Sequence, residues 1–370
     1  MKKILAAVLS LAFAPSLSLA GGSLSPAMLQ DAAPSSAPAL KNNSADNSSV
    51  ASDLYQQASS KDAKTSALMA AAVVLTKTPL EKINAAYQEA SPRDGYSSAL
   101  IALAAAASGA DVKTLNAAYK DAGTKHAFAS AMLAMTSALT GKKIDELNKI
   151  YSATSPRKAM PSAALAAACA MTGRQPAELD KLFSAAAPDD GDASAILAFT
   201  AALTGADIAT LNSYYKSASP DGPIPSAVLA ATCVLSGRDI ASVNALYKQA
   251  KPDGQVPSVI LAMGAALSGK DISELNATYQ KVSPKDQFAS AVLASAMALK
   301  DGKDARRNAV LLAGAAMLAQ IEKEKAEQEE QNQQNNDDDD SHHPGPGGHG
   351  GFPGGPSHGG PHGPGGGGRP

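Results

Sequence analysis

The sequence predicts an all-α protein, an α-solenoid of about eight 32-residue helix–turn–helix repeats with disordered tails. Tyrosine recurs every 32 residues without insertion or deletion, and Phe183 occupies one of these positions. A serine that stands four residues before an alanine recurs with the same period. An array of this kind is typical of stacked, similar units. The tyrosines are Tyr55, Tyr87, Tyr119, Tyr151, Tyr215, Tyr247 and Tyr279.

Two helices are predicted in each unit, and the copy from Pro225 to Gly254 shows them most clearly. The first helix begins near Pro225, because proline fits a first helical turn, and it ends at Gly237, a residue type that closes many helices. Asp239 is the expected N-cap of the second helix, which ends before the turn at Lys251–Gly254. The residues that repeat in this copy are Ser226, Ala230, Gly237, Asn244, Tyr247 and Pro252.

The two helices differ in their apolar surface. The second carries one apolar stripe, Ile240, Val243, Tyr247 and Ala250, at helical spacing. The first is apolar over most of its surface and is rich in alanine, so we expect it to be buried on nearly all sides and to approach its neighbours closely. One such hairpin buries too little area to be stable alone, and its neighbours have to supply the rest.

A capping helix is expected at the carboxyl end of the array, over residues 305–330. Asn308–Leu312 resembles Ser290–Ala294 after only 18 residues, as though the second helix of a unit had been omitted. The segment then becomes acidic from Glu322 onward. An apolar part against the last repeat, followed by a polar part, is what a terminal cap requires.

The two ends of the chain indicate export. Residues 1–20 have the basic start, apolar centre and small-residue cleavage site of a bacterial signal peptide, which predicts a periplasmic or extracellular protein. Residues 21–50 are expected to be a disordered linker, 51–304 the repeat array and 331–370 a disordered tail. The longest apolar run, Ala309–Ala319, is shorter than the ~20 residues of a membrane span.

Charge and motifs exclude several classes of function. Residues 51–321 hold 26 basic and 23 acidic residues, too balanced for the basic stripe of a nucleic-acid binder. The array has none of the common catalytic, phosphate-binding or redox motifs, so no enzymatic activity and no bound cofactor are expected. Cys169 and Cys233 are 64 residues apart, in equivalent places of non-adjacent units, which favours two buried thiols over a disulfide.

The repeated serine, asparagine and tyrosine have two interpretations. One asparagine per unit, displayed along a groove, could bind the backbone of an extended peptide. The interpretation that we favour is structural: these groups satisfy loop and helix-end hydrogen bonds, and the tyrosine ring is buried. In the unit with Phe183 and Asp180, both polar groups change together while the packing positions persist.

The tail has the only other distinctive chemistry of the sequence. Five of the six histidines lie in the last 29 residues, after Asp337–Asp340. Imidazoles with nearby carboxylates suit Zn, Ni or Cu, although the irregular spacing also fits a soluble terminus or an interaction tail. The candidate metal ligands are His342, His343, His349, His358 and His362.

The architecture over residues 51–321 resembles the broad class of helix–turn–helix solenoids that includes tetratricopeptide and Sel1-like repeats. The period is shorter than the roughly 34 residues of tetratricopeptide repeats, and the chain has no tryptophan. The expected function is an exported, non-enzymatic scaffold that binds an unidentified protein or peptide. The two alternatives are an envelope metal-binding protein and a structural component of a coat or matrix.

Overall fold

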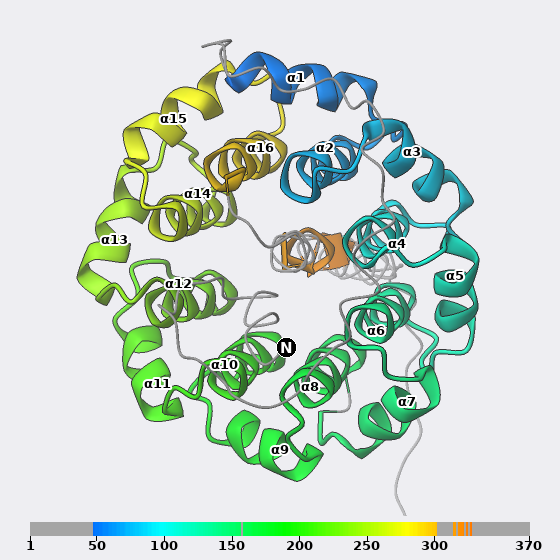
Figure 1. Cartoon of the computed structure of the whole chain (residues 1–370). Coiled ribbons are helices and arrows are strands. Elements are labelled where there is room, and N and C mark those ends of the chain that lie inside the picture. Colours follow the sequence, from blue (N-terminus) through cyan, green and yellow to red (C-terminus); the bar gives the residue numbers. More distant parts are fainter. Residues whose placement is uncertain are drawn as a thin grey trace, which may run out of the picture. The chain divides into compact units, whose positions relative to one another are not determined.

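The computed structural model describes residues 47–156 and 158–301, and residues 314–327 except 316, 322 and 325. The all-helical class is confirmed, since every regular element in these residues is a helix (Figure 1). The described residues as far as Lys323 belong to one compact unit. The predicted signal peptide, most of the predicted linker and the histidine-bearing tail lie outside the described residues.

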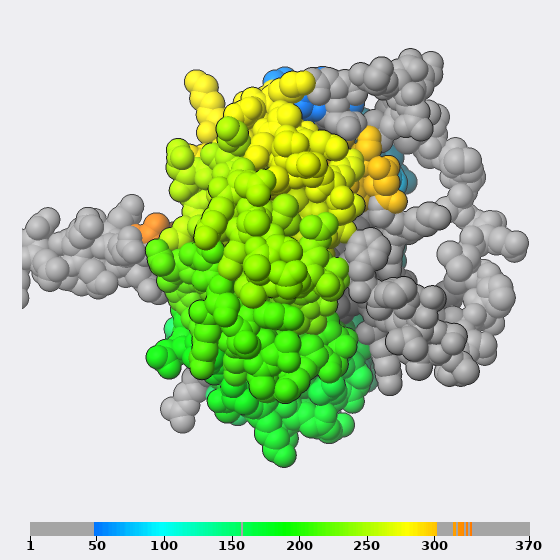
Figure 2. Space-filling model, turned by 90° about the vertical axis from the view of Figure 1, so that its left-hand side faces the viewer, coloured from blue at the N-terminus to red at the C-terminus, as the bar shows by residue number. Residues whose placement is uncertain are grey.

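The two helices of each unit lie in separate layers (Figure 1). The inner layer consists of α2 (Ala63–Thr76), α4 (Gly95–Ser108), α6 (Ala127–Thr140), α8 (Ala159–Thr172), α10 (Gly191–Thr204), α12 (Pro223–Ser236), α14 (Gln255–Ser268) and α16 (Gln287–Leu299). The outer layer consists of α1 (Asn47–Gln57), α3 (Leu80–Glu89), α5 (Val112–Lys120), α7 (Ile144–Ala153), α9 (Pro176–Ser184), α11 (Ile208–Lys216), α13 (Ile240–Gln249) and α15 (Ile272–Lys281). Figure 2 shows one flank of the array, on which consecutive units follow one another from green to yellow.

Local sequence sets the ends of these helices. Asp94 caps α4 by accepting a hydrogen bond from the Ser97 N–H at 2.9 Å, which satisfies one of the free donors of the first turn. Gly109 ends α4 at a φ of 72°, where a side chain would be strained although no atom lies within 4 Å of the place of a Cβ. Glycine is therefore required there by backbone conformation and not by crowding.

The inner helices form the buried layer, as their alanine-rich sequence predicts. Ala230 and Ala262 have no exposed surface, and α8 is buried at every residue from Met160 to Ala170. Each outer helix buries only a narrow face. In α13, Val243 is the one fully buried residue. Small side chains allow the inner helices to approach closely, so that most of the burial comes from contacts with neighbouring units.

The array closes on itself. The last inner helix, α16, packs against α14 on one side and against the first inner helix, α2, on the other, and α1 contacts both α15 and α16 (Figure 1). The sequence predicts a capping helix at the end of the solenoid, but an array whose first and last units are in contact has no end to cap. The second helix that the sequence omits after Ser290 is supplied by α1, which begins at Asn47 inside the predicted linker.

The closing junction repeats the hydrogen bonds found between ordinary neighbours. Between units, Asn276 Oδ1 accepts from the Lys251 N–H at 2.9 Å. At the junction, Ser52 takes the place that a further unit would give to asparagine, and its Oγ accepts from the Ser283 N–H, also at 2.9 Å. Gln56 Nε2 donates to Ser283 Oγ at 3.2 Å, as Gln88 Nε2 donates to Ser59 Oγ. The ring therefore closes in the register of its own repeat.

The described part of the predicted cap is helical and enters the core. Met317, Leu318 and Ile321 are 1%, 4% and 5% exposed, and they belong to the same hydrophobic cluster as the inner helices. Farther along, Ala326 and Glu327 are exposed. The segment is apolar and then polar, as expected, but its apolar part contributes to the core of a closed array.

We predict that Ser52→Ala destabilises the ring by about 1 kcal/mol, because the Ser283 N–H loses its acceptor at the closing junction. The measurement is the free energy of unfolding in urea. Ser152→Ala, an exposed change on α7 with the same effect on helix propensity, is the control and should change stability by less than about 0.5 kcal/mol. Equal stability of the two variants would show that the bond between Ser52 and Ser283 does not stabilise the junction.

Candidate functional site

The repeated serine fastens each inner helix to the loop before it. Ser226 Oγ donates to the Pro220 carbonyl at 2.7 Å, and Ser258 Oγ donates to the Pro252 carbonyl at 2.8 Å. The equivalent bonds are Ser66 to Ser60, Ser98 to Pro92, Ser130 to Thr124, Ser162 to Pro156, Ser194 to Pro188 and Ser290 to Pro284. Since the acceptor is a backbone carbonyl, the bond survives where proline is replaced.

The repeated asparagine joins neighbouring units. Asn244 Oδ1 accepts from the Ser219 N–H at 2.9 Å, and its Nδ2 donates to the Ser217 carbonyl at 2.8 Å. Both partners lie in the loop after the preceding outer helix. Asp180, which replaces asparagine in one unit, keeps the first of these bonds by accepting from the Ser155 N–H at 2.7 Å. The amide ladder is therefore engaged within the protein.

The tyrosine column is packed between units. Tyr247 is half-buried, and burial, assisted by the negative charge of Asp221, raises the pKa of its hydroxyl. Tyr87 donates a long hydrogen bond of 3.5 Å to Ser60 Oγ in the loop of the preceding unit. Gly237 ends α12 at a φ of 68°. All six residue types of the repeat signature thus have a place in the fold.

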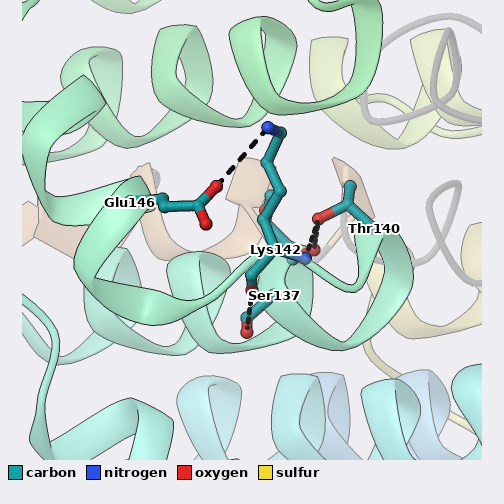
Figure 3. A network of polar contacts seen from close by, with 5 residues as sticks. Ser137, Thr140, Lys142 and Glu146 are labelled. Carbon is teal, nitrogen blue, oxygen red and sulfur yellow. Dashed lines mark hydrogen bonds and ion pairs between the residues drawn. The ribbon is translucent and has the colours of Figure 1, made fainter.

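A further repeated column escaped the sequence analysis: a serine or threonine directly before the residue that ends the inner helix, which is Lys77 after α2 and glycine in the other units of the column. Thr140 Oγ1 donates to the Thr136 carbonyl at 2.7 Å and accepts from the Lys142 N–H at 3.3 Å (Figure 3). This hydroxyl connects the last turn of an inner helix to the start of the next connection. The 32-residue period was the signal that could have revealed it. The column contains Thr76, Ser108, Thr140, Thr172, Thr204, Ser236 and Ser268.

The same connection holds unit-specific contacts. Ser137 Oγ donates to the Lys142 carbonyl at 2.6 Å, and Lys142 Nζ lies 3.7 Å from Glu146 Oε2 (Figure 3). Both charged side chains are substantially exposed, so this ion pair adds less than about 1 kcal/mol. It orders a surface connection and is not a buried reactive pair.

The two cysteines are buried thiols on non-adjacent inner helices. Cys169 lies on α8 and Cys233 on α12, with α10 between these helices in the ring, and neither forms a disulfide. Burial, together with the negative charges of Asp180 and Glu178 beside Cys169 and of Asp239 beside Cys233, raises the pKa of each thiol to about 12. Neither thiol has the lowered pKa of a catalytic nucleophile.

The structure does not place the predicted metal ligands, because His342, His343, His349, His358 and His362 lie outside the described residues. Among the residues that are described, no three side chains of the kinds that bind metals are grouped together. The one histidine of the array, His126, instead caps α6, its Nδ1 accepting from the Ala129 N–H at 3.3 Å.

Membrane-spanning segments were sought in the described part of the chain. None of its helices combines the length and the apolar character needed to cross a bilayer.

Exposed basic residues gather on two neighbouring units. Residues 123–186 contain eight basic and four acidic residues, whereas residues 187–218 contain one basic and four acidic residues. Five lysines of the first stretch are exposed, on α7, on α9 and in the connections before α6, α7 and α8: Lys125, Lys143, Lys149, Lys158 and Lys181. We call these five lysines the basic sector.

Comparison of the chain with models of known protein families, with curated proteins and with solved structures finds no match.

We predict that both thiols resist Ellman's reagent at pH 8 in the folded protein and react on unfolding. Their folded pKa of about 12 exceeds the ordinary value of 9.0, so the unfolded state loses these protons first. The thiols therefore leave stability unchanged below pH 9 and reduce it between pH 9 and 12, by at most about 1.4 kcal/mol per pH unit and thiol.

The matched variant is Cys169→Ala/Cys233→Ala. It lacks both thiols but keeps every tyrosine and lysine, whose side chains also titrate at alkaline pH. Urea unfolding of both proteins at several pH values isolates the contribution of the thiols. An identical loss of stability above pH 9 in the two proteins would contradict the assignment.

Proposed function

We propose that this chain is an exported, non-enzymatic scaffold, a closed array of about eight repeats that binds a protein or peptide on its exposed outer helices. The support is that the repeated residues and the residues that differ between units have different roles. The repeated serine, asparagine and Ser/Thr side chains are engaged in hydrogen bonds within the fold. Residues that differ between units are left to face outward, and variable exposed positions on a rigid frame are suited to recognition.

One column of the outer helices illustrates this variation. The residue after the repeated asparagine is exposed in every unit but changes in size and charge around the ring. It is lysine at Lys149 and Lys181, which belong to the basic sector, and alanine or serine in most other units. The column contains Asp53, Ala85, Ala117, Lys149, Lys181, Ser213, Ala245 and Ala277.

The basic sector indicates the chemistry of the partner. Its exposed lysines attract an acidic protein or peptide surface, and the acidic unit that follows disfavours a shifted binding position. This charge difference, confined to adjacent units of an otherwise balanced array, is the observation that carries the proposal. A local patch of this size suits an acidic peptide better than a nucleic acid, whose repeated phosphates require a continuous basic stripe.

The test is capture of partners from an envelope fraction with the mature chain as bait. The variant Lys143→Glu/Lys149→Glu/Lys181→Glu should bind a captured partner about tenfold more weakly, because three exposed charge contacts become repulsive. The control, Lys82→Glu/Lys113→Glu/Lys248→Glu, changes the net charge equally on exposed positions of other units. Equal capture by all three baits would refute the role of the basic sector.

A second candidate function, metal binding by the tail, is favoured by the concentration of five histidines beside four aspartates near the end of the sequence. The full chain should bind Zn²⁺ or Ni²⁺ in titration calorimetry, and replacing the five histidines with asparagine should abolish binding without changing the unfolding midpoint. Metal binding that persists in this variant would exclude the tail histidines as ligands.

A further inference from the structure

The inner helices are buried on more sides than the two layers explain. An inner helix has neighbouring inner helices on two sides and the outer layer on a third, which leaves the side that faces the interior of the ring (Figure 1). Yet α8 is buried at every residue from Met160 to Ala170, which is around its full circumference. Another part of the chain has to cover the interior side.

Most residues on that interior side are apolar, and the exceptions at the position of Phe128 are Lys64 and Asp192. Ser137 on α6 faces the outer layer, since its Oγ donates to the Lys142 carbonyl in the connection to α7. On the opposite side of α6 lies a stripe of four residues, separated by four, three and four positions. The other inner helices have equivalent positions on the same side. This stripe consists of Phe128, Met132, Met135 and Leu139, which are 1%, 5%, 4% and 7% exposed.

The interior surface also differs from unit to unit. The alanine column represented by Ala230 is the same in every unit, as close contact between inner helices requires. By contrast, the column of Met135 holds phenylalanine at Phe199, methionine at Met263 and alanine at Ala167. An uneven apolar surface inside a regular ring is shaped for one occupant in one orientation.

The described residues contain a segment with the properties of that occupant. In the helical segment from Gly314 to Ile321, Ala315, Met317, Leu318, Ala319 and Ile321 are all at most 6% exposed. At 100° per residue these positions cover about 200° around the helix axis, and Gln320 on the remaining side is half-buried, so none of the described residues of the segment is exposed. A helix lying on the outside of the array would keep one face exposed. The segment also shares one hydrophobic cluster with the inner helices.

The dimensions agree with a single helix in the interior. Eight inner helices packed about 8.5 to 10 Å apart place their axes on a circle with a radius of about 11 to 13 Å. Subtracting the inner helices' own radius of about 5 Å leaves a space about 12 to 16 Å wide, and one helix with its side chains is about 10 to 12 Å wide. One helix fits, and two do not.

We propose that the interior of the ring is a binding site for an apolar helix, and that this chain fills the site with its own segment, residues 314–321. Farther along the chain, Ala326 and Glu327 are exposed. An apolar helix of another chain has access to the interior only when this segment is displaced. The site is distinct from the outer surface proposed above for protein binding.

The first test changes the segment in the full chain. Leu318→Glu places a charge in the apolar interior and should release the segment, whereas Ala326→Glu places the same charge at an exposed position of the same helical segment. The probes are the dye 1-anilinonaphthalene-8-sulfonate and a labelled synthetic peptide of residues 309–327. The Leu318→Glu protein should bind the dye and one equivalent of peptide, and the natural and Ala326→Glu proteins should bind neither.

A Leu318→Glu protein that retains its helical circular dichroism and unfolds cooperatively, yet binds neither probe, would overturn the proposal. Where this variant does not fold, photo-cross-linking decides. A benzophenone amino acid replaces the half-buried Gln320 in the otherwise natural chain. Cross-links to the inner, even-numbered helices are expected. Cross-links confined to the outer, odd-numbered helices would place the segment elsewhere and refute the inference.

Discussion

Close packing between alanine-rich inner helices is the interaction on which the rest of the structure depends. Alanine permits short distances between helices, but it buries little apolar area per residue, so no unit can be stable by itself. In an open stack, the first and last units would each expose to water an apolar helix face that other units bury. Closure removes both faces, because α16 packs on α2 as it packs on α14. The same requirement explains why the interior side of the ring is apolar and covered.

Closure depends on a hydrogen-bond register as much as on apolar contact. In six outer helices the asparagine amide joins the helix to the loop of its neighbour with two bonds, as Asn276 does with the Lys251 N–H and the Gln249 carbonyl. At the junction a serine at the equivalent position receives the corresponding N–H. Hydrophobic packing alone tolerates sliding of one helix along another, whereas a directional bond between fixed groups selects one register. The two ends of the array are therefore joined with the geometry of its middle.

The repeated polar groups and the unit-specific residues have separate tasks. Serine, asparagine and the Ser/Thr column satisfy loops and helix ends, which leaves their polar atoms engaged within the fold. The differences between units are found on the outer helices, where the basic sector lies, and on the interior stripe, where Phe199 and Ala167 occupy equivalent positions. A rigid repeated frame thus presents two irregular surfaces, one exposed to solvent and one directed to its own interior.

The sequence by itself determined the period, the two helices of each unit, their ends and the burial of the alanine-rich helix, because these features depend on residues close together in the chain. Asp239 as a cap and Gly237 as a helix end follow from such local chemistry. Only the tertiary structure decided that the array is closed, that α1 completes the last unit and that Met317 and Leu318 enter the core. The contacts that close the array join residues more than 200 positions apart, such as Ser52 with Ser283, and no periodicity specifies them. A small rotation between successive units, set by packing, determines whether eight identical steps end in an open stack or return to the start.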